Sequence, residues 1–215
     1  GGTSLVGGQI PFGEVLLSLK KMRAVRDVTP LDDAMTVEAG LTLLEAQQAA
    51  AAAGRAFPLS LAAEGSATIG GVISTNAGGT QVLRYGMMRD LVLGLEAVLP
   101  NGEVFHGLKR LRKDNTGYDL KQLLIGAEGT LGVVTAATLK LFPIMRSRAV
   151  AVVALETAAA SIELLARAKA ETGGGVEAFE LMKRLGMELV LKNIPDTREP
   201  LDSTPDWYVL IEIAS

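Results

Sequence analysis

The stretch from Thr68 to Gly79 constrains this chain more than any other. It reads T-I-G-G-V-I-S-T-N-A-G-G, so two glycine pairs bracket a short run of apolar and small polar residues. Glycine allows the backbone to adopt positive φ and to approach another group closely. Free backbone N–H groups at such a place, beside the start of a short helix, form a natural site for an anion such as phosphate. A tight turn at each pair is the alternative interpretation.

Two other glycine-rich segments favour the anion site over isolated turns. Residues Gly1–Gly8 read G-G-T-S-L-V-G-G, and Gly126–Gly132 read G-A-E-G-T-L-G. The chain has 24 glycines in 215 residues, which exceeds the usual share of about 7%. The excess lies in these segments and in Gly173–Gly175 rather than along the whole chain. The repetition therefore indicates a site assembled from several loops.

Composition excludes several classes of protein. A length of 215 residues with 48% hydrophobic residues allows one large domain, or one domain and part of another. The net charge of −3 and the lack of a basic stripe argue against a nucleic-acid surface. The densest basic cluster, Lys109–Lys113, is interpreted as a solvated turn, with attraction of an anionic substrate as the alternative. We find no run of about 20 apolar residues and no targeting peptide, and expect a cytoplasmic protein, with peripheral membrane association left open.

Few residues of this chain can carry covalent or metal chemistry. It has no cysteine and a single histidine, His106, so we expect no metal site and assign no catalytic residue. His106 is expected on the surface at the end of a hairpin. Gly126–Gly132 lacks the Lys-Ser/Thr of a Walker A loop, and no G-x-S-x-G is present. Gly173–Ala178 fits G-x-G-x-x-A but follows an expected helix instead of a strand.

Periodicity and turn signals predict an α+β chain. The elements expected in the first part are strands over residues 15–19, 22–28, 35–40, 91–99, 103–105 and 130–142 and a helix over residues 42–54. Thr42 and Glu45 have the spacing of a capping box. Asn101, followed by glycine between two apolar runs, predicts a hairpin turn. Residues 113–120 are interpreted either as a helix start capped by Asp119 or as a loop that faces a ligand.

The pattern changes after Pro143, where we place a domain boundary. Residues 1–143 then form one domain and residues 144–215 the start of a second. The elements expected after the boundary are a strand over residues 150–155, helices over 158–171 and 176–191, and a strand over 207–213. In the second of these helices, Phe179 and Met182 begin a series of apolar residues at steps of three and four, which is typical of a helix. Because the module stops at a strand, we expect the second domain to be incomplete.

Six motifs, in this order along the chain, resemble those of a known family. They are G-G-T-S-L-V-G-G, T-I-G-G-V-I-S-T-N-A-G-G, R-Y-G-M-M-R-D, L-G-L-E-A-V-L-P-N-G, K-D-N-T-G-Y-D-L and I-G-A-E-G-T-L-G-V-V-T. Residues 1–143 resemble the FAD-binding domain of the vanillyl-alcohol oxidase/p-cresol methylhydroxylase superfamily. Within it, they are most similar to the FAD-linked D-2-hydroxyacid dehydrogenases (D-lactate dehydrogenase, the glycolate oxidase flavin subunit and D-2-hydroxyglutarate dehydrogenase). Two later stretches, A-F-E-L-M and Y-V-L-I-E, are similar to the cap domain of the last group.

The resemblance implies a two-subdomain FAD-binding fold followed by part of an α+β cap domain, and it implies roles for three loops. The first loop, whose amides hold the pyrophosphate, is matched by Gly1, Gly2, Thr3, Ser4, Leu5 and Gly7. The second, which lines the other side of the cofactor, is matched by Ser66, Thr68, Gly70, Gly71, Asn76 and Gly78. The segment that closes the cleft is matched by Glu128, Gly129, Gly132 and Val133. Covalent-flavin members carry histidine at the position of Thr3, so the resemblance implies non-covalent FAD.

The function implied by the resemblance is oxidation of a D-2-hydroxyacid to the 2-oxoacid, with hydride transfer to flavin. A small-molecule substrate and an electron acceptor are the implied partners, and a homodimer is compatible with the family. The family has a βαβ element before the position of Gly1, and catalytic and metal-binding histidines after the cap. We therefore expect this chain to be an N-terminally truncated flavin-binding segment that is inactive alone. The alternatives are a non-catalytic flavin-binding module, or subunit completed by a partner chain, and a glycine-rich domain without a ligand.

Overall fold

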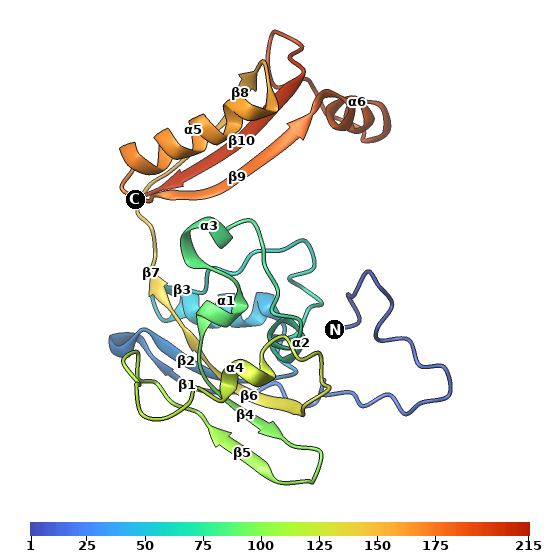
Figure 1. The fold of residues 1–215 in the computed structure, drawn as a ribbon, viewed down its shortest axis with the longest axis vertical. Helices are drawn as coiled ribbons and strands as arrows, with labels where there is room; N and C mark the ends of the chain where they lie inside the picture. The colour runs from blue at the N-terminus through green and yellow to red at the C-terminus, as the bar shows by residue number, and fades with distance from the viewer. The chain divides into compact units, whose positions relative to one another are not determined.

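The chain divides into two units in the computed structural model, which describes residues 1–215 (Figure 1). The first unit contains Gly1–Gly79 and Tyr85–Ile144, and the second contains Thr80–Arg84 and Met145–Ser215. The division after Ile144 lies next to the boundary placed at Pro143. The assignment of Thr80–Arg84 to the second unit had no signal in the sequence.

An antiparallel five-stranded sheet forms the base of the first unit. Its strands lie in the order β1 (Val25–Thr29), β2 (Ala34–Glu38), β6 (Val133–Lys140), β4 (Val92–Val98) and β5 (Val104–Gly107). The central strand β6 is buried without interruption from Val134 to Leu139. It pairs Ala137 with Val37 of β2 on one side and with Leu95 of β4 on the other. A strand that is covered on both faces needs no alternation of polar residues, which explains its continuous run of small and apolar side chains.

Two helices, α1 (Leu43–Ala52) and α2 (Ile69–Ser74), complete the core of the first unit. The short α2 contacts both β2 and β6. Ile69 and Ile73 of α2 are fully buried, as are Val37, Leu95 and Leu139 of the sheet. At about 25 cal/mol per Å² of apolar surface, burial of such side chains supplies most of the favourable free energy of folding. The two helical isoleucines, four residues apart, thus fix α2 on the sheet.

The expected capping box holds the start of α1. The hydroxyl of Thr42 accepts a hydrogen bond from the backbone amide of Glu45 at 3.3 Å. The Glu45 carboxylate accepts one from the backbone amide of Thr42 at 2.9 Å. The backbone hydrogen bond from Thr42, together with Arg23, lowers the pKa of Glu45. The helix ends at Ala52, and Gly54 follows with φ of +70°, close to the expected end.

Short elements complete the first unit. They are η1 (Pro30–Asp32), β3 (Arg55–Ala56) paired with β7 (Phe142–Pro143), η2 (Met88–Leu91) and α4 (Lys121–Leu124); α3 (Val82–Tyr85) runs from the second unit into the first. The hairpin of β4 and β5 is confirmed, and its Gly102 has φ of +87°. His106 is exposed on β5, as expected. Asp119 does not cap α4, because its carboxylate instead accepts the side chains of Lys121 and Gln122 at 2.5 and 3.0 Å.

The second unit contains a three-stranded antiparallel sheet and two helices. The strands lie in the order β8 (Arg148–Leu155), β10 (Trp207–Ala214) and β9 (Val176–Lys183). Helix α5 (Ala158–Glu171) contacts β8 and β9, and α6 (Arg184–Asn193) contacts β9. Val176, Val209 and Ile211 form the buried centre of this unit.

The strand expected over residues 15–19 is wrong. Residues 1–24 contain no helix or strand, and Figure 1 shows them as a long arm that precedes β1. The apolar residues Val15, Leu16 and Leu17 are 95%, 63% and 66% exposed. An extended run becomes a strand only when a neighbour satisfies its N–H and C=O groups, and no strand of the structure pairs with this run.

The helix expected over residues 176–191 is wrong in its first half. Residues Val176–Lys183 form β9, and only Arg184–Asn193 are helical. Phe179 and Leu181 also lie two residues apart, as on one face of a strand, and local pattern does not distinguish a short buried strand from a helix. Pairing decides the outcome, because β10 pairs with β9 from Trp207 to Ile213 with a single shift of register, and Ile211 lies opposite Phe179.

The α+β class expected from the sequence is confirmed by these antiparallel sheets and separate helices. None of the helices combines the length and the apolar character that a membrane crossing requires.

We expect Thr42→Ala to lower the free energy of unfolding of the intact protein by about 1 kcal/mol, because the amide of Glu45 loses its acceptor. Its effect should be largest above pH ~4.3, where an unfolded glutamate is ionised. It should shrink as the pH falls through the lower pKa of folded Glu45, since protonation removes the other half of the box. Urea unfolding at pH 7 and pH 3 measures both effects. Gln48→Ala, at an exposed site of α1, is the control, and equal losses at both pH values would contradict the expectation.

Candidate functional site

The second glycine segment begins a helix that lies close against the end of β2. Thr68 is extended, with φ −100° and ψ 154°, and α2 starts at the next residue. The amides of Ile69 and Gly70 donate to the carbonyls of Leu41 and Ala39 at 2.9 and 2.8 Å. A Cβ on Gly70 would lie 2.8 Å from the Cβ of Ala39, so only glycine permits this approach. The start of α2 is therefore fixed to the segment between β2 and α1.

Two amides at the start of α2 remain available to a ligand. The N–H groups of Thr68 and Gly71 donate no hydrogen bond within the chain, and Gly71 is exposed. Thr68 and Ser66, together with Gly1 of the first segment, line an open cavity of about 270 Å³. The other lining residues are Lys20, Arg23, Gly40, Thr42 and Gly65. Residues from several loops thus line one cavity, and Thr68 brings one of the two available amides to it.

Two cations add positive charge to this cavity. Lys20 and Arg23 both line it, and Arg23 is also ion-paired with Glu45. The segment that carries Lys20 and Arg23 lies directly against Gly40. Only glycine allows this approach, because a Cβ on Gly40 would lie 2.0 Å from the carbonyl oxygen of Leu19. Sequence analysis did not single out Lys20, Arg23 or Gly40. None of them belongs to a glycine-rich motif, and only the fold brings them beside Thr68.

The first glycine segment reaches the second through its first residue. The nitrogen of Gly1 donates to Thr68 Oγ1 at 3.4 Å, and a Cβ on Gly1 would lie 2.2 Å from the carbonyl oxygen of Ser66. Two of the following glycines, Gly2 and Gly7, have φ of +70° and +72°. The residues between them are exposed, namely Thr3, Ser4 and Leu5, so the structure does not bring these three against the second segment.

The third glycine segment lies at the other end of α2. The amide of Gly126 donates to the carbonyl of Ile73 at 3.0 Å, and the amide of Glu128 donates to that of Ser74 at 2.8 Å. Glu128 and Gly129 both have positive φ, at +52° and +82°, and both are exposed. The amides of the third segment therefore satisfy the last carbonyls of α2, and the turn at Glu128 and Gly129 is exposed to solvent.

Arg89 connects the second and third segments. Its amide donates to Asn76 Oδ1 at 2.9 Å, and its guanidinium donates to the carbonyls of Ile125 and Gln122 at 2.6 and 2.9 Å. Asn76 has φ of +47°, a conformation that asparagine tolerates better than most residues. The side-chain oxygen of Asn76 thus accepts a hydrogen bond within the protein. The remaining predicted site residues, Gly78, Gly132 and Val133, are half-buried.

This arrangement suits an anionic group bound through the backbone. The available amides, the hydroxyl of Ser66 and the two cations supply donors and positive charge without a metal ion. The exposed glycine at the first turn of α2 leaves space for a ligand to approach the backbone. A pyrophosphate needs these features, because its charge is best met by convergent N–H groups.

A second cavity, of about 440 Å³, lies beside the loop of residues 107–122. His106 and residues of this loop line it, which keeps the ligand-facing interpretation of residues 113–120 as a prediction. The basic cluster Lys109–Lys113 is largely matched by carboxylates. Lys109 pairs with Asp114 at 2.7 Å and Arg110 with Asp27 at 3.1 Å. Exposed ion pairs of this kind favour a solvated turn over a surface that attracts anions.

Comparison with known proteins identifies the fold and its relatives. The model of the FAD binding domain family matches residues 1–107. The D-2-hydroxyglutarate–pyruvate transhydrogenase of Saccharomyces cerevisiae is 42% identical over 99% of this chain and 43% of its own length. The mitochondrial D-2-hydroxyglutarate dehydrogenase of Arabidopsis thaliana is 41% identical over 99% of this chain and 38% of its own length. The chain thus spans about two-fifths of the curated relatives that it matches.

A solved structure of alkyldihydroxyacetonephosphate synthase has the same fold. It superposes with a TM-score of 0.79 and 18% sequence identity, and the match covers 99% of this chain and 42% of that one. At this identity the likeness concerns the fold alone.

Proposed function

We propose, since residues 1–107 match the model of the FAD binding domain family, that this chain is the flavin-binding part of an FAD-dependent dehydrogenase. The proposed reaction is oxidation of a D-2-hydroxyacid to the 2-oxoacid. D-2-hydroxyglutarate is the proposed substrate, because the relatives from yeast and Arabidopsis, at 42% and 41% identity, are named for it. An electron acceptor is needed to complete each turnover.

The convergence of the glycine segments around α2 carries this proposal. The first and second segments share the cavity at the start of the helix, and the third segment bonds to its end. Phosphate alone would need only one such loop. A dinucleotide, which is long and carries a pyrophosphate in its middle, makes use of all three.

The proposed roles follow from the donors that each segment offers. The available amides of Thr68 and Gly71 would hold pyrophosphate oxygens, and Lys20 and Arg23 would balance their charge. The first loop, with Gly1, Gly2, Thr3, Ser4, Leu5 and Gly7, would cover the pyrophosphate from the opposite side. Asn76, Gly78, Glu128, Gly129, Gly132 and Val133 would shape the remainder of the cleft, with Ser66 and Gly70 behind it. FAD supplies, when bound, an acceptor for the hydride of the substrate.

No residue of this chain is proposed as the proton acceptor. His106 is exposed on β5 and does not line the cavity at the start of α2. The cytoplasmic location expected from the sequence stays a prediction, since the name of the Arabidopsis relative places that protein in mitochondria.

We expect the purified intact protein to show a flavin absorption spectrum that D-2-hydroxyglutarate bleaches under anaerobic conditions. D-lactate and glycolate, added to separate samples, test the breadth of the substrate class. Bleaching by D-2-hydroxyglutarate, with slower or no bleaching by its L-enantiomer, supports the proposed reaction. A flavin spectrum that none of these acids changes would leave a flavin-binding module without dehydrogenase activity, and a protein without flavin would refute the proposal.

We expect the flavin to leave the protein on acid precipitation, because Thr3 lacks the nucleophilic ring nitrogen that a covalent flavin link requires. The supernatant should contain all of the flavin, and the pellet should be colourless. The matched variant is Thr3→His, which supplies that nitrogen at the same exposed position. Flavin retained in the wild-type pellet would contradict the expectation.

We expect valine at Gly71 to weaken FAD binding and valine at Gly70 to lower the stability of the apoprotein. A Cβ on Gly71 would meet only Thr68 Oγ1, at 3.3 Å, so Gly71→Val should leave the unfolding temperature of the apoprotein nearly unchanged and weaken FAD binding about tenfold or more. Gly70→Val should destabilise the apoprotein by about 1–3 kcal/mol, because its Cβ would overlap Ala39. Flavin titration and thermal unfolding measure the two effects. Unchanged FAD affinity in Gly71→Val would remove the second segment from the proposed site.

A further inference from the structure

A short excursion of the chain separates the second glycine segment from the motif that follows it. Residues Thr80–Arg84, which we call the strap, belong to the second unit, although Gly79 before them and Tyr85 after them belong to the first. The chain therefore passes between the units at three points, before Thr80, after Arg84 and after Ile144. The strap is too short to fold alone, so side-chain contacts must hold it in the second unit.

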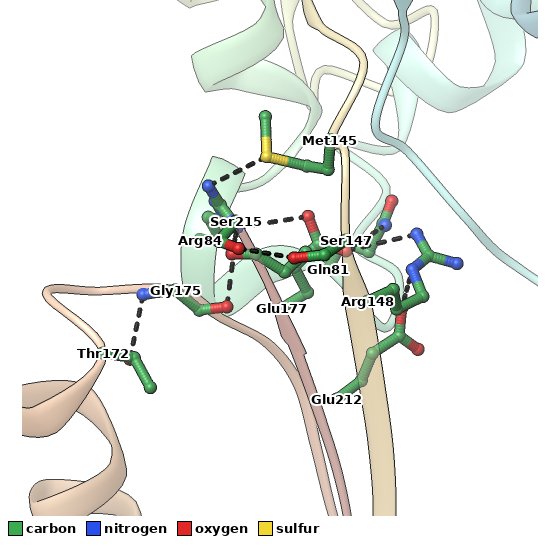
Figure 2. A network of polar contacts seen from close by, with 11 residues as sticks. Gln81, Arg84, Met145, Ser147, Arg148, Thr172, Gly175, Glu177, Glu212 and Ser215 are labelled. Carbon is green, nitrogen blue, oxygen red and sulfur yellow. Dashed lines mark hydrogen bonds and ion pairs between the residues drawn. The ribbon is translucent and has the colours of Figure 1, made fainter.

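Arg84 makes most of these contacts, and Figure 2 shows it at the centre of a polar network. Its Nη1 donates to the carbonyl oxygen of Ala214 at 2.6 Å, and also lies 3.5 Å from the carbonyl of Gly175 and 3.5 Å from Glu177 Oε1. Its Nη2 lies 3.2 Å from Met145 Sδ, at the third passage of the chain between the units. One guanidinium thus bonds to β10, to β9 and to the residue that leads into β8.

The carboxylate that Arg84 meets is buried and has several partners. The side chain of Glu177 is 1% exposed. Gln81 of the strap donates to its Oε2 at 3.3 Å, and Arg148 of β8 donates to the same oxygen at 3.2 Å. Arg148 also pairs with Glu212 at 2.6 Å, so the network contains two cations and two anions. A buried carboxylate needs such partners, and Gln81 and Arg84 of the strap are two of those that Glu177 has.

Two short segments, Asn76–Ala77 before the strap and Met88–Arg89 after it, are bonded to each other, and we call them the neck. The amide of Met88 donates to the carbonyl of Ala77 at 2.9 Å, and the amide of Arg89 donates to Asn76 Oδ1 at 2.9 Å. These two bonds join the chain before the strap to the chain after it. Arg89 in turn holds the third glycine segment through the carbonyl of Ile125. The path from the strap to two of the three glycine segments is therefore continuous in covalent and hydrogen bonds.

Gly79 is the joint between the second glycine segment and the strap. A Cβ on it would lie 1.9 Å from the carbonyl oxygen of Ser60, so its backbone lies directly against the first unit. Glycine also absorbs changes of φ and ψ that other residues resist. The end of the glycine segment is thus held from two sides, by Ser60 and by the strap.

We propose that Arg84 is a positioning residue for the flavin site. By fixing the strap in the second unit, it holds the neck formed by Asn76, Ala77, Met88 and Arg89, and through the neck the second and third glycine segments. The second unit then influences cofactor retention through the strap. This inference rests on the proposed flavin-binding function.

The test compares Arg84→Met and Glu177→Gln with the wild type in the intact protein. Hydrogen exchange is measured for peptides that cover residues 68–79, 80–85 and 121–130, and the dissociation rate of FAD is measured by dilution. Both variants should speed exchange in all three peptides, and FAD should dissociate roughly fivefold faster or more, as is typical of coupled sites. Arg84→Lys keeps the charge but cannot reach Ala214 and Glu177 together, so its effect should be intermediate.

Arg184→Met is the matched control. The Arg184 side chain is 24% exposed, against 21% for Arg84, and it also makes several ion pairs in the second unit, with Glu188 and Glu199. It does not contact the strap, so the three peptides and FAD dissociation should match the wild type. Where Arg84→Met does not fold, Glu177→Gln, which keeps the shape of the side chain, gives the same readouts.

Two results would overturn the proposal. One is faster exchange in residues 80–85 while residues 68–79, residues 121–130 and FAD dissociation stay unchanged. The other is an equal increase in every peptide, including α5, which would make Arg84 a general stabilising residue. A wild-type protein without FAD would refute the proposed function instead, and hydrogen exchange of the glycine segments would still decide whether the strap positions them.

Discussion

The contact between Gly70 and Ala39 is the constraint on which the site depends. The two backbones approach so closely that a Cβ on Gly70 would lie 2.8 Å from the Ala39 side chain. This approach lets the amides of Ile69 and Gly70 bond to the chain between β2 and α1. The next amide, that of Gly71, keeps no acceptor in the chain, and Gly71 is exposed. Gly70 is thus needed for close packing against Ala39, and Gly71 for the approach of a ligand to the backbone.

The site is held together by backbone bonds more than by side chains. Both ends of α2 are bonded to other segments, the start to Leu41 and Ala39 and the end to the third glycine segment. Arg89 is the exception, since its side chain donates to carbonyls just before the third segment while its own amide bonds to Asn76. Backbone amides have fixed directions and carry no entropy cost of a long side chain, which suits a cofactor whose oxygens require several donors at once.

Local signals in the sequence predicted the parts of the fold that depend on neighbours in the chain. The capping box of Thr42 and Glu45, the Asn101-Gly102 turn and the span of α5 follow from such signals, and all three are present. The cations of the candidate cavity do not, because Lys20 and Arg23 reach Thr68 only after the sheet has formed. The absent strand at residues 15–19 has the same origin, since an apolar run specifies a strand only together with a partner.

The misassigned β9 shows how one error in secondary structure hides a functional contact. A helix over residues 176–191 would give no reason to pair Glu177 with residues near 84 or 148. As a strand, β9 lies beside β10, and its Glu177 is buried and shares Arg84 with the carbonyl of Ala214 at the end of β10. A carboxylate in that position requires cations, and the fold supplies them from β8 and from the strap. The excursion of Thr80–Arg84 is therefore explained by the burial of Glu177, a requirement that becomes visible only when residues far apart in the sequence are brought together.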